Sequence, residues 1–386
     1  MMDHEKLFQI TDSLNGEYIG MWEDVCNLES PTADKAGVDA VGEYFASRAR
    51  EKGWRVEVYP QEKAGNPVCI VMNPEAAGPA VVLSGHLDTV HPKGMFGTPA
   101  VRREGDRILG PGVGDCKGGA VAGMMAMDAL SRAGYDGGPV MLILQTDEEN
   151  SSRVSGKATI RWICERAKDA AAFLNLEPYG KGKACLSRKG IITFRFRVHG
   201  VKAHSSICAT KGANAIAEAA RLILEIEKIK DPEGLTCCCS VIQGGTVPNT
   251  VPDLCEFLVN VRFADAAQDA RIRDFMRKLA DTPHISGCSI ELDIVSQRLA
   301  MERSERNEAL LAKMNRCFAR CGLPELQAVF SAGGSDAAEV TAAGIPCVDS
   351  IGVEGGGYHS EREWALIPSL ADCAKRIVAF LAGEGE

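Results

Sequence analysis

The chain has 386 residues, more than a single hydrophobic core usually spans, so we expect two domains. Hydrophobic residues make up 45% and charged residues 25% of the sequence, which is the balance of an ordinary globular protein. The formal net charge of −9 argues against a nucleic-acid-binding or anionic-membrane surface, where a basic patch is expected.

The sequence also predicts a cytoplasmic protein. Its first ten residues hold no apolar run of the kind found in a signal peptide, and no stretch approaches the roughly 20 apolar residues of a membrane span. There are 15 cysteines, an odd number scattered over a long chain. This usage fits a reducing compartment better than a disulfide framework.

The first half of the chain alternates helices and apolar strands. In chain order we expect a helix over 35–52, a strand over 54–59, a strand over 80–84, a helix over 119–133 and a strand over 140–145. Buried strands that alternate with helices predict an α/β domain with a mainly parallel sheet.

The pattern changes near Arg188. Apolar and polar residues alternate over 192–198, which predicts a strand with one wet face. The elements that follow are a helix over 213–229, strands over 236–242 and 254–263, a helix over 267–280 and a strand over 289–296. The order β-α-β-β-α-β is the ferredoxin-like arrangement, so we expect an inserted α+β domain.

After this insertion the α/β pattern resumes. It continues with a helix over 307–321, a strand over 345–350 and a helix over 366–381. The predicted domains are therefore residues 1–186 and 300–386, which form the two parts of one catalytic domain, and residues 187–299, which form the inserted domain.

Polar residues gather where strands of the outer domain should end, which is where open α/β sheets bind ligands. His86 and Asp88 are two apart in an extended segment, so they face the same side, and Asp88 is placed to hold one ring nitrogen of His86. The glycine-rich run 110–119 carries Asp115. It resembles a phosphate-binding loop but lacks the spacing of a Walker motif.

Further acids follow later strands. They are the run 147–149 and Glu177, and a glycine-rich segment near the C-terminus carries His359. Adjacent carboxylates repel one another unless a cation neutralises them. Nitrogen and oxygen donors in this number suit a hydrolytic site with two zinc ions, for which Co²⁺ or Mn²⁺ can substitute.

These motifs, in this order, resemble metallopeptidase family 20, which includes glutamate carboxypeptidase, aminoacylase and succinyl-diaminopimelate desuccinylase. The resemblance covers nearly the whole chain and implies a di-zinc peptidase-like catalytic domain. By this resemblance His86, Glu177 and a bridging Asp115 bind one metal ion. Asp115, Glu149 and His359 bind the other.

The same resemblance assigns the remaining roles in the catalytic domain. Glu148 is the general base, and Asp88 orients His86. The peptide bond between Asp115 and Cys116 is expected to be cis. No role is predicted for His91.

In the family, the inserted domain mediates dimerisation and donates a histidine to the active site of the partner. The matching residue is His204, with His199 as the competing candidate. Asn249, Arg262 and Gly334 match positions that contact the substrate. We therefore expect a homodimer.

The sequence favours a carboxypeptidase that releases a C-terminal amino acid, with glutamate as one candidate, because Arg262 suits a free carboxylate. An aminoacylase or desuccinylase that acts on N-acyl amino acids is the alternative. A non-catalytic, metal-binding dimer and a phosphate-transfer enzyme are more remote alternatives. The intact Glu148 argues against the first of these and the missing Walker spacing against the second.

Overall fold

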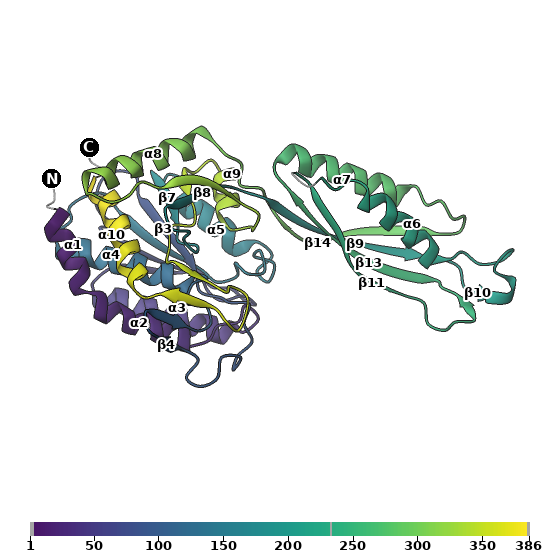
Figure 1. The fold of residues 1–386 in the computed structure, drawn as a ribbon, viewed down its shortest axis with the longest axis horizontal. Helices are drawn as coiled ribbons and strands as arrows, with labels where there is room; N and C mark the ends of the chain where they lie inside the picture. Colours follow the sequence, from purple (N-terminus) through teal and green to yellow (C-terminus); the bar gives the residue numbers. More distant parts are fainter. Residues whose placement is uncertain (1–3, 232–233, 384–386) are drawn as a thin grey trace. The chain divides into compact units, whose positions relative to one another are not determined.

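A computed structural model describes residues 4–231 and 234–383. The chain divides into two compact units (Figure 1). The first comprises Met1–Ser187, Arg303–Phe330 and Ser335–Glu386, and the second comprises Arg188–Glu302 and Ser331–Gly334. Residues 331–334, which the sequence analysis placed with the catalytic domain, group with the second unit.

The first unit is built on a six-stranded sheet. Its strand order is β1 (Arg55–Val58), β2 (Val68–Met72), β6 (Val140–Gln145), β3 (Val81–His86), β7 (Ala172–Asn175) and β16 (Cys347–Val348). The pairs from β6 to β16 are parallel, whereas β1 and β2 add an antiparallel edge. Strands β2 and β3 are buried along their whole length, as expected of a sheet that is covered on both faces.

Helices cover both faces of this sheet. Alternate residues of β2, β3 and β6 join one apolar core with side chains of α1 (His4–Ser13), α2 (Asn15–Asn27), α3 (Lys35–Glu51), α4 (Lys117–Arg132), α8 (Glu305–Arg320) and α10 (Pro368–Gly383). Two shorter helices, α5 (Ala158–Ala167) and α9 (Ala337–Ala342), contact β6 and β16. The mixed α/β fold class predicted from the sequence is confirmed. No helix in the described part of the chain is long and apolar enough to cross a bilayer.

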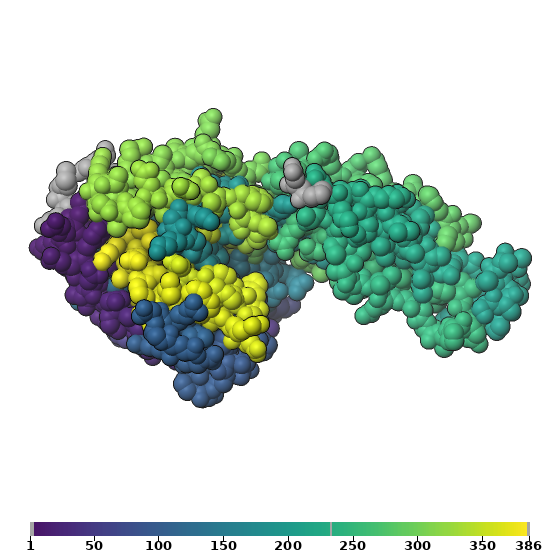
Figure 2. Space-filling view, in the orientation of Figure 1, coloured from purple at the N-terminus to yellow at the C-terminus, as the bar shows by residue number. Residues whose placement is uncertain are grey.

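Two small sheets complete the first unit. One has the order β17 (Gly355–Gly356), β18 (Trp364–Leu366), β5 (Arg107–Leu109) and β4 (Arg102–Glu104), and the other pairs β15 (Gln327–Ser331) with β8 (Lys183–Arg188). The first of these brings the C-terminal segment, yellow in Figure 2, beside the blue segment around residue 100. This pairing sets the segment that carries His359 against the chain that leads into the glycine-rich loop.

The second unit is a four-stranded antiparallel sheet with the order β11 (Thr236–Gly244), β13 (Leu254–Phe263), β9 (Gly190–His199) and β14 (Ser289–Arg298). Alternate residues of β9 and β13 are buried. They pack with α6 (Ala215–Glu227) and α7 (Ala266–Asp281), and Phe196 stacks on Phe257 with ring centroids 4.8 Å apart. Numbered within the unit, the strand order is 2-3-1-4, the ferredoxin-like order that the β-α-β-β-α-β sequence predicts.

Several elements were not predicted from the sequence. The clearest is β2, whose residues Val68–Met72 are all buried and which inserts between β1 and β6. The two N-terminal helices were also missed, although Tyr18 and Trp22 of α2 are fully buried. Short apolar runs and amphipathic helices are hard to separate from loops by pattern alone.

Candidate metal centre

His86 is the last residue of β3 and is 2% exposed. Its Nδ1 lies 2.9 Å from the backbone oxygen of Asp88 and 3.6 Å from Oδ1 of the same residue. Because a carbonyl oxygen only accepts, Nδ1 donates to it, so loss of a proton from the ring would leave the lone pair on Nε2, which faces Asp115. Asp88 therefore holds the ring mainly through its backbone oxygen.

Asp115 lies between the two histidines of the site. Its Oδ1 is 3.0 Å from His86 Nε2, and its Oδ2 is 3.3 Å from His359 Nε2. The two carboxylate oxygens thus face different imidazoles, which is the arrangement of a carboxylate that bridges two cations. The Asp115–Cys116 peptide bond is cis, which confirms the prediction.

Two glutamates complete this arrangement. Oε2 of Glu149 lies 3.3 Å from His359 Nε2, and Oε1 of Glu177 lies 3.7 Å from His86 Nε2. Glu149 and Glu177 follow the carboxyl ends of β6 and β7, which flank β3 in the sheet. The structure therefore brings together all five predicted metal ligands as two half-sites that share Asp115.

The Asp88 carboxylate organises the acidic loop. It is fully buried and accepts hydrogen bonds from the backbone N–H of Glu148 at 3.1 Å and of Glu149 at 3.2 Å. A third bond comes from the Thr32 hydroxyl at 2.8 Å. One side chain therefore fixes the backbone of both adjacent glutamates, and Glu148 itself is 8% exposed.

The carboxylates of the cluster crowd one another. Burial raises the pKa of Glu149 to about 7 and that of Glu177 well above its usual range, and the charge of Asp115 adds to both shifts. Burial also opposes ionisation of Asp115, but hydrogen bonds from His359 and His86 hold its pKa below the usual range. Hydrogen bonds to Asp115 and Glu149 raise the pKa of His359 to about 10.

Without metal ions, bound protons therefore offset the negative charge of the clustered carboxylates. Divalent cations would supply the same positive charge, and the donor set of two imidazoles and three carboxylates is one that zinc accepts. These residues therefore fit a two-metal site.

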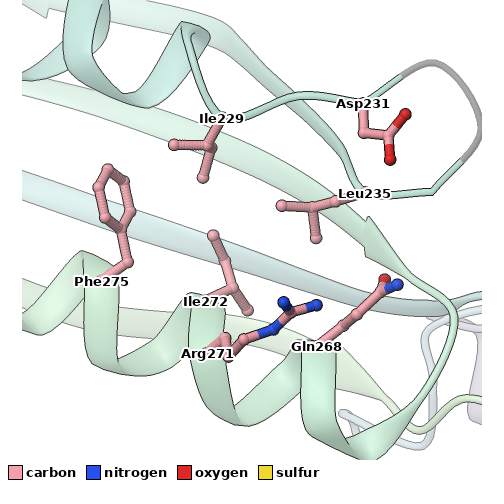
Figure 3. Close-up of a pocket in the computed structure, with 7 residues that line it drawn as sticks. All are labelled: Ile229, Asp231, Leu235, Gln268, Arg271, Ile272 and Phe275. Carbon is pink, nitrogen blue, oxygen red and sulfur yellow. The ribbon is translucent and has the colours of Figure 1, made fainter.

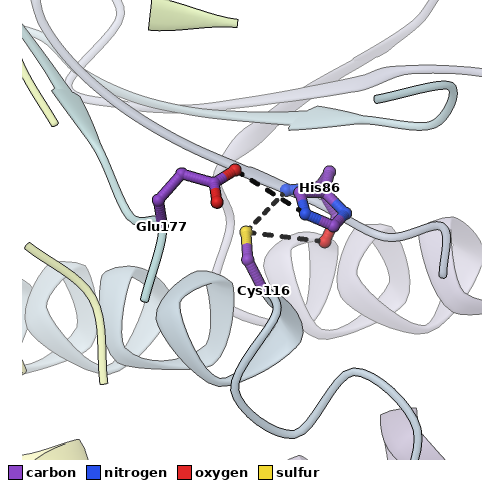
Figure 4. Close-up of side chains that lie close together, drawn as sticks. All are labelled: His86, Cys116 and Glu177. Atoms are coloured by element: carbon purple, nitrogen blue, oxygen red, sulfur yellow. Dashed lines mark hydrogen bonds and ion pairs between the residues drawn. The ribbon is translucent and has the colours of Figure 1, made fainter. Parts of the chain in front are cut away.

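A thiol also lies at the His86 half-site (Figure 4). The backbone N–H of His86 donates to Cys116 Sγ at 3.0 Å, and donor atoms of His86, Cys116 and Glu177 lie within 4.8 Å of one another. Burial raises the pKa of the Cys116 thiol to about 12, so the sulfur is a neutral group that supports the end of β3.

The sequence analysis missed two side chains that contact this cluster. Thr32 is a common residue far along the chain from Asp88, and no pattern marks it. Glu363 lies in the charged run 361–363, which is typical of an exposed loop, yet it is 1% exposed and accepts the backbone N–H of Asp115 at 3.0 Å. Its place four residues after His359 was the one available signal.

The second unit holds the remaining predicted residues as two pairs. His204 ends β10 (Ala203–His204), which pairs with β12 (Thr250–Val251), and the carbonyl oxygen of Asn249 accepts the N–H of Ser205 at 2.9 Å. Nη1 of Arg262 donates to the Ala332 carbonyl at 2.9 Å, in the loop that carries Gly334. His204 therefore lies beside Asn249, and Arg262 beside the glycine loop.

His204 is exposed, and its ring has a defined tautomer. Its Nδ1 accepts the backbone N–H of Ser206 at 3.2 Å and lies 2.8 Å from the hydroxyl of the same serine. The neutral ring therefore carries its proton on Nε2, which leaves a donor that can reach a group outside its own segment.

The second unit also has a cavity of about 330 Å³ between α7 and the chain that enters β11 (Figure 3). Its lining residues are Ile229, Asp231, Leu235, Gln268, Arg271, Ile272 and Phe275. None of them belongs to the predicted site.

A family model and several known proteins are similar to this chain. The family model described as peptidase family M20/M25/M40 matches residues 82–383, a span that contains every residue predicted for the site. Carboxypeptidase G2 of Pseudomonas sp. (strain RS-16) is 27% identical over 386 residues, which cover 97% of this chain and 92% of that protein.

Two further similarities extend the comparison. Succinyl-diaminopimelate desuccinylase of Gluconobacter oxydans (strain 621H) is 26% identical over 326 residues, which cover 80% of this chain and 82% of that protein. The crystal structure of the Bacillus subtilis YXEP protein, described as a dinuclear metal binding peptidase, matches with a TM-score of 0.70 at 17% identity and covers 97% of this chain and 99% of that one.

Proposed function

The chain belongs to peptidase family M20/M25/M40, a metal-dependent family of hydrolases, and from this premise we propose that it cleaves amide bonds with two zinc ions. We assign it a carboxypeptidase-like reaction that releases a C-terminal amino acid, with glutamate as the first candidate. The observation that carries the proposal is Asp115, whose two oxygens face His86 and His359.

His86 and Glu177 would hold one ion, His359 and Glu149 the other, and Asp115 both. Such a pair of ions supplies a water molecule of lowered pKa and polarises the scissile carbonyl. Cobalt or manganese would be accepted by the same donors.

The protein's own groups move the proton. Glu148 would take a proton from water as the water oxygen attacks the amide carbon, and would pass it to the leaving nitrogen as the C–N bond breaks. The Asp88 carboxylate accepts the backbone N–H of Glu148, so the point from which the Glu148 side chain extends is fixed. The same carboxylate holds the backbone of Glu149, whose side chain faces His359 instead. Glu149 would therefore bind metal, and Glu148 would transfer the proton.

His204 would stabilise the oxyanion that forms during the attack. Its Nε2–H is the kind of donor that this role requires. Following the family resemblance, we assign His204 to the active site of a partner subunit in a homodimer.

The second unit has a surface that suits such a dimer. Strand β11 lies at the edge of its sheet and exposes Val241 and Ile242, and Leu224 of α6 is 65% exposed. An apolar, unpaired strand edge tends to pair with another chain, which supports association through this unit.

Arg262 and Asn249 would bind the carboxylate of the substrate. Arg262 donates to one carbonyl oxygen through Nη1, and its planar fork suits a carboxylate. A relative named as a desuccinylase keeps the deacylation of N-acyl amino acids as the second candidate, because the same metal chemistry serves both reactions.

All 15 cysteines are free thiols, which supports the predicted reducing, cytoplasmic location.

A panel assay on zinc-loaded protein tests the function. It compares peptides that end in glutamate, N-acetyl and N-succinyl amino acids, and plain dipeptides. Preferred release of a C-terminal amino acid would support the carboxypeptidase assignment, and preferred cleavage of an acyl group would replace it with the second candidate. Absence of turnover on every substrate by protein with full metal content would favour the non-catalytic dimer.

A further inference from the structure

Glu363 connects two segments that carry predicted metal ligands. It follows His359 by four residues and directly precedes β18. Its Oε1 accepts the backbone N–H groups of Gly114 and Asp115, each at 3.0 Å, and its Oε2 accepts the N–H of Gly112 at 3.3 Å. Three amides of the glycine-rich loop thus converge on one carboxylate.

A fourth donor faces the same carboxylate. Nε2 of His91 lies 2.6 Å from Oε2 of Glu363, and both side chains are buried, at 4% and 1% exposure. The ring of His91 packs edge-on against Phe96 with centroids 5.0 Å apart, which limits its rotation. A carboxylate so deeply buried is stable only when its oxygens are satisfied, as they are here.

The loop needs this support because its backbone is unusual. Gly112 has φ of +74°, in the left-handed region, and a Cβ there would lie 2.8 Å from the Thr89 side chain. Successive N–H groups that turn toward one point form a nest that favours an anion. In this chain the Glu363 carboxylate lies at that point and accepts the N–H groups of Gly112, Gly114 and Asp115.

We propose that Glu363, clamped by His91, is a positioning residue that holds Asp115 in place between His86 and His359. This inference rests on the proposed function, since Asp115 is there the residue shared by both ions. The hydrogen bond from Asp115 to Glu363 comes from the backbone N–H, so Glu363 acts through the backbone of Asp115. Partners of this kind typically change metal affinity or activity by about 10–100-fold when they are removed.

The test is the zinc affinity of Glu363→Ala, measured by competition with a chromophoric chelator. We expect binding about 10–100-fold weaker than in the wild type. Glu363→Gln is the conservative variant. Its amide oxygen can still accept from Gly114 and Asp115, whereas its NH₂ group cannot accept from Gly112 or His91, so its affinity should lie between the two.

A matched control comes from the second unit. Glu218 is also fully buried and also holds backbone amides, those of His284 at 3.2 Å and Ile285 at 2.8 Å. Glu218→Ala and Glu363→Ala should both lower the melting temperature, but Glu218→Ala should leave zinc affinity unchanged. A purely structural role for Glu363 would make the two variants alike.

The zinc affinities of the variants and of the wild type separate the inference from the proposed function. Wild-type zinc affinity in folded Glu363→Ala, or in Glu363→Gln if the alanine variant does not fold, would overturn the inference and leave the proposed function standing. Failure of the wild-type protein to bind zinc, cobalt or manganese would overturn both.

Discussion

The two units hold their predicted site residues in different ways. In the first unit, His86 and His359 each lie 3.0–3.7 Å from two of the carboxylates of Asp115, Glu149 and Glu177. Of these five residues only His359 is exposed. In the second unit, His204 and Asn249 lie on the surface. A cluster whose members are fixed in advance suits metal binding, whereas exposed donors suit groups that arrive with a substrate or a second copy of the chain.

The largest effect should come from Glu148, the proposed base in the first unit. Glu148→Ala is expected to lower kcat by about 10²–10⁴-fold, because proton transfer is lost, while zinc content stays near that of the wild type. Turnover and metal content are measured on the same preparation. Glu149→Ala is the matched variant and should lose metal; loss of metal from Glu148→Ala instead would exchange the two roles.

The second unit gives the next effect. His204→Ala is expected to lower kcat by about 10²–10³-fold through the loss of one oxyanion donor, with zinc affinity and association state unchanged. Steady-state kinetics and sedimentation measure this. His199→Ala, the competing histidine, serves as control and should retain activity. Near-normal rates in His204→Ala would remove this residue from the reaction.

A smaller effect should follow from the support of the acidic loop. Asp88→Asn leaves one oxygen for three donors, namely the N–H groups of Glu148 and Glu149 and the hydroxyl of Thr32. Zinc affinity or kcat should fall by about 10–100-fold. Thr32→Val keeps both backbone bonds, so its loss should be clearly smaller. Equal losses in the two variants would contradict the role of Asp88 as the organiser of the loop.

The smallest effect concerns pH and the metal-free protein. The folded-state pKa of His359 is raised from 6.5 to about 10, so its stabilising contribution is complete below about 6.5 and is lost as pH rises through 10. The pKa of Glu149 is raised from 4.5 to about 7, so its ionisation also destabilises the fold as pH rises through that window.

Melting temperatures of metal-free protein should therefore decline from about pH 5 to pH 10, and zinc should flatten the decline because it replaces the protons. Thermal scans with and without zinc over this range measure the difference. Parallel curves would mean that the cluster does not exchange protons for metal.

Much of this site could be predicted because its residues follow strand ends. His86 ends β3, Glu149 and Glu177 follow β6 and β7, and the carboxyl ends of parallel strands meet at one edge of a sheet. The ferredoxin-like order of the second unit was also predictable from the alternation in β9 and the element sequence.

What supports those residues could not be predicted. Glu363 reaches Gly112 from 251 positions away, and Thr32 reaches Asp88 from 56 positions away. Such contacts depend on how the chain packs, and no local period or motif encodes them. The short strand β2 was missed for a related reason. A five-residue apolar run becomes a strand through its pairing with neighbouring strands, which the local sequence does not show.

The most direct test of the central claim is anomalous diffraction at the zinc edge from crystals grown with excess zinc. We predict two peaks per chain, one between His86 and Glu177 and one between His359 and Glu149, with Asp115 bound to both. Carboxylates that point into solvent with no ion between them, in such crystals, would contradict it.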